Sequence, residues 1–164
     1  MPFHTPNLIP ESEPVPERTE TAEFVIRPLT IADVDMDYEA VMSSCDRIRG
    51  TFGPSDEWPS DDLTHEQDSI DVAWHHKEFQ RRDAFTYAVT NTDETVEFGC
   101  LYVVPTDTDH DAAVYFWVSD AAVEQGLEDE IESHIRDWLS EAWPLNDFAY
   151  PGRDIPWEEW DPVK

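Results

Sequence analysis

The stretch with the clearest chemical character runs from Ala112 to Trp143, where an apolar strand leads into a short acidic turn and a long helix. Residues 112–118 are apolar on both faces, so we expect a central strand that is covered on both sides. The turn contains Gly126. Free amides and the positive dipole end at a helix start favour anions, so a phosphate-bearing cofactor, if the protein has one, would bind here.

The histidines and cysteines show no complete metal site, since His65, His75 and His76 could bind a metal ion only with further ligands from elsewhere. His75 and His76 are adjacent, so on a helix they point about 100° apart and cannot hold one ion together. Cys45 and Cys100 show neither a Cys-x-x-Cys pattern nor a cysteine–histidine spacing, and we expect both as small core residues. No metal site is predicted.

The elements that must position this stretch follow from hydrophobic period, caps and breakers. Thr30 and Thr64 each begin a capping-box pattern, which predicts helices over residues 30–44 and 64–82. Spacing within the second helix marks one stripe, formed by Ile70, Ala73, Trp74 and Lys77.

Strands are expected over residues 24–29, 85–89, 96–104, 112–118 and 148–150. The second and third form a hairpin. Alternation along the third places Phe98 and Cys100 on one face, and Gly99 inside it indicates close approach of another backbone or a ligand. A single helix after Asp120 carries an apolar stripe of Val123, Leu127, Ile131, Ile135, Trp138 and Leu139. The order β-α-α-β-β-β-α-β predicts an α+β fold, a mixed sheet with flanking helices.

Composition bounds the class of protein. The chain has 164 residues, 40% of them hydrophobic, which predicts one domain with a real core. It carries 10 basic and 38 acidic residues, a net charge of −28, spread along its length. Such a surface is typical of halophilic proteins in a high-salt cytoplasm; the alternative is an acidic protein with a basic partner. We expect no nucleic-acid binding, because neutralising phosphates needs a basic face. No membrane span or signal peptide is predicted, so we expect a cytoplasmic protein.

The two ends differ from the middle. Residues 1–22 hold five prolines among acids, which predicts an extended N-terminal arm. This arm either docks partly on a domain formed by residues 23–164, which we favour slightly, or is free in solution. The C-terminal tail around Trp157 and Trp160 is rich in aromatic residues and is expected to pack back on that domain.

Three segments resemble the GNAT superfamily of acyl-CoA-dependent N-acyltransferases. FVIRPLTIADV, from Phe24, is similar to the family's opening strand and helix, and TVEFGCLYVV to its third strand with an internal glycine. YFWVSDAAVEQGLEDEI resembles the fourth strand, the pyrophosphate loop and the third helix. The resemblance covers about residues 24–150 and implies a GNAT-like mixed sheet.

The resemblance implies acetyl-CoA as the cofactor. In that family, backbone amides after the fourth strand bind the pyrophosphate. The usual loop positions fall on Val123, Gly126 and Glu128, of which only Gly126 matches. The cofactor-binding residues implied in this way are Phe116, Trp117, Val118, Val123, Gly126, Leu127 and Glu128.

The resemblance also implies transfer of an acetyl group to the amine of a small molecule or peptide. The family places a tyrosine acid on further strands, whereas 14 residues follow Tyr150 here, too few for those elements. Tyr150 and Tyr115 are the candidate acids for the leaving thiolate, and Glu97 or Asp111 could accept the amine's proton through water.

Two alternatives stay open. A non-catalytic GNAT-like domain that binds a partner or regulates another protein is favoured by the poorly matched loop and the short C-terminus. A homodimer could instead build the missing wall from a neighbouring copy, through the tail near Trp157 and Trp160.

Overall fold

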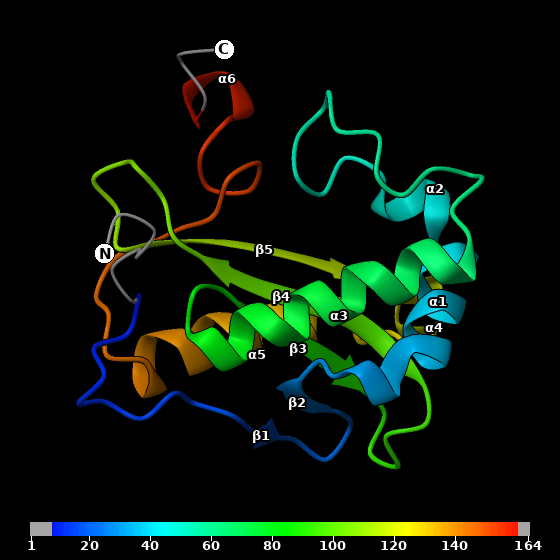
Figure 1. The fold of residues 1–164 in the computed structure, drawn as a ribbon, viewed down its shortest axis with the longest axis horizontal. Coiled ribbons are helices and arrows are strands. Elements are labelled where there is room, and N and C mark those ends of the chain that lie inside the picture. The colour runs from blue at the N-terminus through cyan, green and yellow to red at the C-terminus, as the bar shows by residue number, and fades with distance from the viewer. Residues whose placement is uncertain (1–7, 161–164) are drawn as a thin grey trace.

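The computed structural model of this chain describes residues 8–160, so the first part of the predicted arm lies outside the described residues. Figure 1 shows a curved sheet with helices packed against it. The sheet has six strands in the order β1-β2-β3-β4-β5-β6, antiparallel from β1 to β5, while β6 runs parallel to β5. The strands are β1 (Thr19–Glu20), β2 (Val25–Pro28), β3 (Phe85–Thr90), β4 (Glu97–Val104), β5 (Ala112–Val118) and β6 (Phe148–Ala149).

Helices cover both faces of this sheet. On one face α1 (Val34–Ser43) and α3 (His65–Arg81) bury side chains such as Val72, and on the other α5 (Glu128–Ala142) buries Ile131. Each layer is a separate buried cluster with the sheet between them. The shorter helical elements are η1 (Ile31–Asp33), α2 (Cys45–Ile48), α4 (Asp120–Glu124) and α6 (Trp157–Trp160).

Several predicted features are confirmed. β5 has its predicted bounds and is buried along most of its length. Thr30 and Thr64 both form capping boxes. A Cβ at Gly99 would overlap the carbonyl oxygen of Trp117, so β4 approaches the backbone of β5 too closely for any other residue. Cys45 and Cys100 are buried and free.

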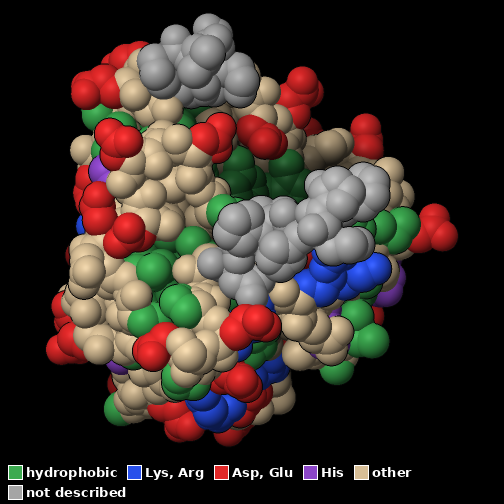
Figure 2. Space-filling view, turned by 60° about the vertical axis from the view of Figure 1, so that its left-hand side comes forward, with side chains coloured by type: hydrophobic (Ala, Val, Ile, Leu, Met, Phe, Trp, Pro, Cys, Tyr) green, Lys and Arg blue, Asp and Glu red, His purple; other side chains and the backbone are tan. Residues whose placement is uncertain are grey.

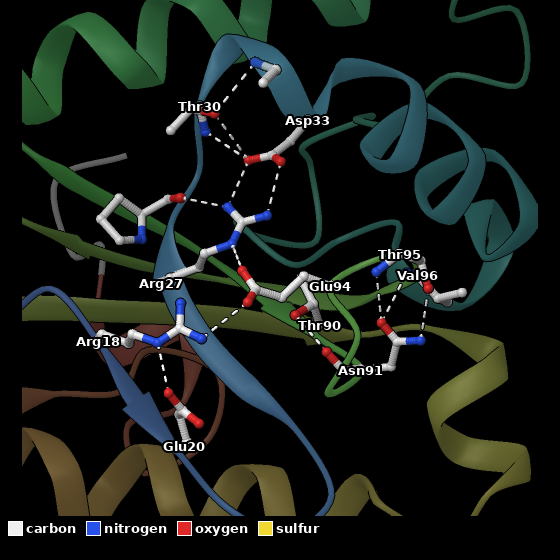
Figure 3. A network of polar contacts seen from close by, with 12 residues as sticks. Arg18, Glu20, Arg27, Thr30, Asp33, Thr90, Asn91, Glu94, Thr95 and Val96 are labelled. Atoms are coloured by element: carbon white, nitrogen blue, oxygen red, sulfur yellow. Dashed lines mark hydrogen bonds and ion pairs between the residues drawn. The ribbon is translucent and has the colours of Figure 1, made fainter.

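The start of the first helical segment is tied to the sheet by Arg27 (Figure 3). Its guanidinium donates two hydrogen bonds of 2.9 Å to Asp33 and one of 2.6 Å to Glu94. Asp33 also accepts the backbone amide of Thr30 at 2.8 Å, and Arg18 pairs with Glu94 at 3.0 Å. The network fixes η1 against β2 and against the turn of the β3–β4 hairpin.

The described ends of the chain pack on the domain. Ile9 is fully buried, and Arg82 donates to the carbonyl oxygen of Pro10 at 2.8 Å. The arm ends in the short strand β1, which the sequence-based prediction of an extended arm missed. In the tail, Trp157 stacks on Tyr115 with ring centroids 6.4 Å apart.

The side chains of β4 do not alternate as predicted. The β3–β4 register shifts between Val89 and Thr90, which pair with Gly99 and Glu97, so Phe98 is the extra residue of a β-bulge. Phe98 therefore joins the layer of α5, whereas Cys100 faces α1 and α3. The prediction that Phe98 and Cys100 share a face is wrong.

Two helices also differ from their predictions. The stripe with Ile70 and Trp74 faces solvent, since these side chains are 64% and 60% exposed, while α3 buries Asp68 and Val72. The predicted single C-terminal helix is divided into α4 and α5 by Gly126, whose φ is +76°.

Acidic residues outnumber basic residues by 38 to 10 in this chain. On the face shown in Figure 2, acidic side chains are spread widely, whereas basic side chains gather in a few places. This agrees with the even spread of acids along the sequence. Within residues 8–160, no helix combines the length and the apolar character needed to cross a bilayer.

Candidate functional site

The sheet opens beside the second half of β5. Residues 112–113 pair with residues 148–149, and the parallel pairing ends there. The chain then leaves the sheet and forms a turn over residues 150–155, held by its own backbone hydrogen bonds. Within the described chain, residues 115–118 of β5 therefore have no neighbouring strand on that side.

A cavity of about 330 Å³ lies at this open edge of the sheet. Its walls are residues 47–51, residues 115–118 and the tail from Pro151 to Trp157, with Glu128 at the start of α5. Three of the chain's 10 basic residues line it, Arg47, Arg49 and Arg153. In a chain with a net charge of −28, such a concentration of guanidinium groups favours an anionic ligand.

Two of these arginines stand at the end of α2 and reach solvent. The Arg47 side chain is 43% exposed and pairs with Asp120 at 2.5 Å. The Arg49 side chain is 33% exposed and pairs with Asp61 at 2.6 Å. A phosphate could compete with these exposed carboxylates, because ion pairs at the surface contribute little stability.

The third arginine occupies the open edge of β5. Arg153 donates to the backbone carbonyl oxygen of Phe116 at 3.2 Å, and its guanidinium carbon lies 3.6 Å from the centroid of the Phe116 ring. Burial lowers the pKa of Arg153, partly opposed by the charge of Glu132. The tail thus supplies a side chain where a further strand, or an extended ligand, would bind.

The predicted catalytic residues do not meet in one place. Tyr115 lines the cavity. Tyr150 is buried beneath Arg136, 4.1 Å from its ring centroid, and burial raises the pKa of Tyr150 to about 12. Asp111 accepts the backbone amides that precede β6. Glu97 faces α1, away from the cavity wall.

Glu97 belongs to a second group of reactive side chains. The bulge at Phe98 turns Glu97 to the face of Cys100, and its Oε2 lies 3.4 Å from the Cys100 Sγ. The same sulfur lies 3.5 Å from Oδ1 of Asp37 on α1. Asp68 of α3 is hydrogen-bonded to Asp37 in turn. Four residues from three elements therefore meet beneath the sheet.

Burial determines the ionisation of this acid cluster, defined as Asp37, Asp68, Glu97 and Cys100. It raises the pKa of Glu97 to about 7 and that of Asp68 to about 9. The pKa of Asp37 rises well above its usual value, first through burial and then through Glu97. Burial and the two nearest carboxyls also raise the pKa of Cys100.

A second cavity, of about 130 Å³, opens beside the acid cluster. Asp37, Asp68 and His75 contribute to its polar wall together with Asp71, and aromatic rings and two aliphatic side chains form the rest. The Phe52 ring lies 4.9 Å from that of Tyr102 and 5.3 Å from that of Tyr115, measured between centroids. An aromatic wall therefore separates the second cavity from the first.

No protein-family model matches this chain, and no curated protein matches it in sequence. Solved structures do. A ribosomal-protein-S5-alanine acetyltransferase from Vibrio fischeri matches with a TM-score of 0.59 and 14% identity, over 76% of this chain and 68% of that one. RimL, a ribosomal L7/L12 alpha-N-protein acetyltransferase in complex with coenzyme A, has a TM-score of 0.58 and 14% identity, over 77% and 70%. A protein described as a GNAT-family acetyltransferase from Bordetella pertussis has a TM-score of 0.53 and 14% identity, over 77% and 73%.

This chain has the GNAT fold. Its β5 stands where the resemblance placed the fourth GNAT strand, and its gap lies beside that strand. Of the predicted cofactor-binding residues, four line the cavity and three do not. Phe116, Trp117, Val118 and Glu128 form its wall. The remaining three are Val123, Gly126 and Leu127.

In this GNAT-fold chain, the loop after β5 is a closed helical turn. The amides of Gly126 and Leu127 donate to the carbonyl oxygens of Val123 at 2.9 Å and Ala122 at 3.0 Å, the two bonds of a Schellman motif. A Cβ on Gly126 would meet nothing within 4 Å, so its positive φ, rather than close approach, calls for glycine. These amides are already paired within the loop.

Sequence reasoning missed the arginines that line the cavity beside β5. Arg47 and Arg49 lie at the end of α2 and Arg153 lies about 100 residues later, so no local spacing joins them. The scarcity of basic residues was a usable signal. Because the chain has 10 of them among 164 residues, each one is a candidate for binding an anion. The acid cluster was missed because the bulge that unites Glu97 with Cys100 has no clear mark in the sequence.

Proposed function

We propose that this protein is an acyl-CoA-dependent N-acyltransferase that moves an acetyl group from acetyl-CoA to the amine of a small molecule or peptide. The observation that carries the proposal is the gap beside residues 115–118 of β5, lined by three arginines. The likeness to acetyltransferase structures, one of them in complex with coenzyme A, supports the same conclusion.

The gap assigns different roles to its arginines. Arg47, beside α4 and the start of α5, is suited to the cofactor's phosphates, because a guanidinium matches their geometry and charge. Arg153 lies along the open edge of β5. An extended part of the cofactor bound at this edge would donate a hydrogen bond to the carbonyl oxygen of Phe116 in place of Arg153. Binding at this edge requires Arg153 to move.

The reaction needs few protein groups. The amine attacks the thioester carbonyl, the carbon–nitrogen bond forms, the carbon–sulfur bond breaks, and the thiolate takes up a proton while the nitrogen loses one. Positioning of the two substrates supplies most of the acceleration. Tyr115 is the predicted acid that lies in the cavity, where its ring is held between Phe52 and Trp157. Glu97 and Tyr150 remain predictions outside this cavity.

Titration of coenzyme A by calorimetry in molar KCl tests the cofactor site. Wild-type protein should bind, and Arg47→Gln should weaken binding by about tenfold, the loss expected for one charge-assisted hydrogen bond. Arg81→Gln is the matched control, because Arg81 is exposed and pairs only locally with Asp83. Absence of binding at millimolar coenzyme A contradicts the proposal.

A second candidate function is a non-catalytic GNAT-fold domain that binds a partner or ligand. It is favoured by Arg153, which already occupies the open edge of β5, and by the paired amides of Gly126 and Leu127. A panel of amines with acetyl-CoA, assayed for released thiol, separates the two. Thiol release that depends on an amine supports the enzyme, and bound coenzyme A without turnover supports the binding domain.

A further inference from the structure

The acid cluster brings three buried carboxyl groups and a thiol together without a positively charged partner from the described chain. Asp37, Asp68 and Glu97 are 4%, 1% and 1% exposed. None of them forms an ion pair with a lysine, arginine or histidine of the described chain. The thiol of Cys100 has one hydrogen and two carboxylate neighbours. A buried set of this kind is costly unless a cation or shared protons neutralise it.

Two carboxylate oxygens of the cluster point to a missing partner. Oε1 of Glu97 and Oδ2 of Asp68 are buried and have no hydrogen-bond partner among the described residues. Buried polar atoms in folded proteins are nearly always paired, so each such atom calls for an explanation. Both oxygens belong to members of the cluster, so a ligand bound among these side chains would supply the missing partner.

The spacing of the cluster fits one metal ion. Ligand atoms of Asp37, Glu97 and Cys100 all lie within 4.8 Å of one another. The two sulfur–oxygen distances are 3.5 Å and 3.4 Å. A tetrahedral ion with metal–sulfur bonds of about 2.3 Å and metal–oxygen bonds of about 2.0 Å requires a sulfur–oxygen edge of about 3.5 Å. Both sulfur–oxygen distances therefore match the edges of such a tetrahedron.

We propose that Asp37, Glu97 and Cys100 bind a divalent metal ion of the zinc class, with Asp68 as the fourth ligand or as the partner of a metal-bound water. The sulfur ligand favours a borderline metal such as Zn²⁺ over Mg²⁺ or Ca²⁺, which prefer six or more oxygens. The ion would join α1, α3 and β4 at the centre of the fold, a structural role distinct from the cofactor gap.

The surroundings supply an access path and outer support. Asp37 and Asp68 line the second cavity, through which an ion can reach the cluster. The hydroxyl of Tyr102 bonds to the Cys100 side chain, and Tyr102 accepts the Trp117 indole N–H at 2.9 Å. Hydrogen bonds of this kind orient ligands and stabilise a thiolate.

Cobalt(II) titration of EDTA-treated protein in molar KCl tests the site, since high salt displaces ions held weakly by the acidic surface. One equivalent should bind and give a thiolate-to-cobalt charge-transfer band with the intense visible absorption of a tetrahedral ion. Cys100→Ser should lose the band and weaken binding by about a hundredfold. Cys45→Ser is the matched control, because Cys45 is the other buried free thiol and should leave the band unchanged.

Stability provides a second measurement that does not depend on the variants. Zn²⁺ that binds the folded state alone must raise the melting temperature of EDTA-treated wild-type protein, and binding must release the thiol proton at neutral pH. No band and no rise in melting temperature with stoichiometric Co²⁺ or Zn²⁺ would overturn the proposal. A band that disappears in Cys45→Ser rather than in Cys100→Ser would also overturn it.

Discussion

Asp33 and Asp37 are four residues apart on the first helical segment, yet their environments are opposite. Burial alone would raise the pKa of Asp33, but bonds from Arg27 and Thr30 outweigh it and the pKa is lowered. At Asp37 burial and Glu97 act together, and the pKa rises. One turn of helix thus separates an acid that is ion-paired with an arginine from an acid that has no ion pair within the described chain.

The β3–β4 hairpin repeats the contrast. Hydrogen bonds from Arg18 and then from Arg27 lower the pKa of Glu94 (Figure 3). Three residues later, burial raises the pKa of Glu97 to about 7. Two guanidinium groups reach the partly exposed Glu94, whereas Glu97 is buried without an ion pair in the described chain, so burial and the reach of the arginines together decide which acids are compensated. Acids beyond the reach of Arg27 need a ligand or a proton of their own.

The largest expected effect comes from removing that guanidinium. Arg27→Met leaves Asp33 buried without its partner, and we expect a loss of about 3 kcal/mol in the free energy of unfolding. Denaturant unfolding measures it. Adding Asp33→Asn should restore part of the loss, because no charge is then left unpaired. A loss that Asp33→Asn deepens instead would show that Arg27 acts through packing alone.

A smaller effect of opposite sign is expected at the unpaired acids. In EDTA-treated protein at pH 8, Glu97→Gln should raise the free energy of unfolding by about 1 kcal/mol, because it removes a negative charge beside Asp37 and Cys100. Glu94→Gln, three residues away, should lower it. If both variants destabilise the metal-free protein, the claim that Glu97 is uncompensated while Glu94 is compensated is contradicted.

Acid titration tests the lowered pKa of Asp33, the acid that is paired with Arg27. The pKa of Asp33 is lower in the folded than in the unfolded chain, so its contribution is present above the ordinary value of 3.8 and is lost as the pH falls through the folded value. Melting temperatures between about pH 5 and pH 2 should fall more steeply in wild type than in Asp33→Asn. Equal slopes would contradict a lowered pKa at Asp33.

The smallest effect is expected at the rim of the paired network. The Arg18 side chain is 44% exposed and bonds to Glu20 and Glu94. In molar salt, charges at the surface are screened within about 3 Å, so Arg18→Gln should leave the melting temperature almost unchanged. A shift as large as that of Arg27→Met would show that Arg18 is part of the buried network.

The sequence predicted the elements better than their faces. The strand at 112–118 and the caps at Thr30 and Thr64 follow from local patterns, because hydrophobic period and capping chemistry act within a few residues. The exposure of Ile70 and Trp74 could not be predicted in this way. The buried side of α3 is instead formed by Asp68, a member of the acid cluster, and by Val72.

The candidate site was predicted only in part. The family resemblance implied a cofactor site that includes Phe116, Trp117 and Val118, and these three residues line the cavity beside β5. Local pattern could not reveal that Arg153 returns from the tail to the same strand, because that contact depends on where the chain leaves β6. The meeting of Asp37, Glu97 and Cys100 depends on one extra residue in β4, and a bulge shifts every later side chain to the other face.

Arg153 makes the open edge of β5 a site of competition within the molecule. Any ligand that extends along the strand must first exchange with a side chain already held by a ring and a carbonyl oxygen. The measured affinity of such a ligand is then its intrinsic affinity multiplied by the fraction of molecules in which Arg153 has left the strand. Shortening that one side chain would convert a self-occupied edge into a vacant one.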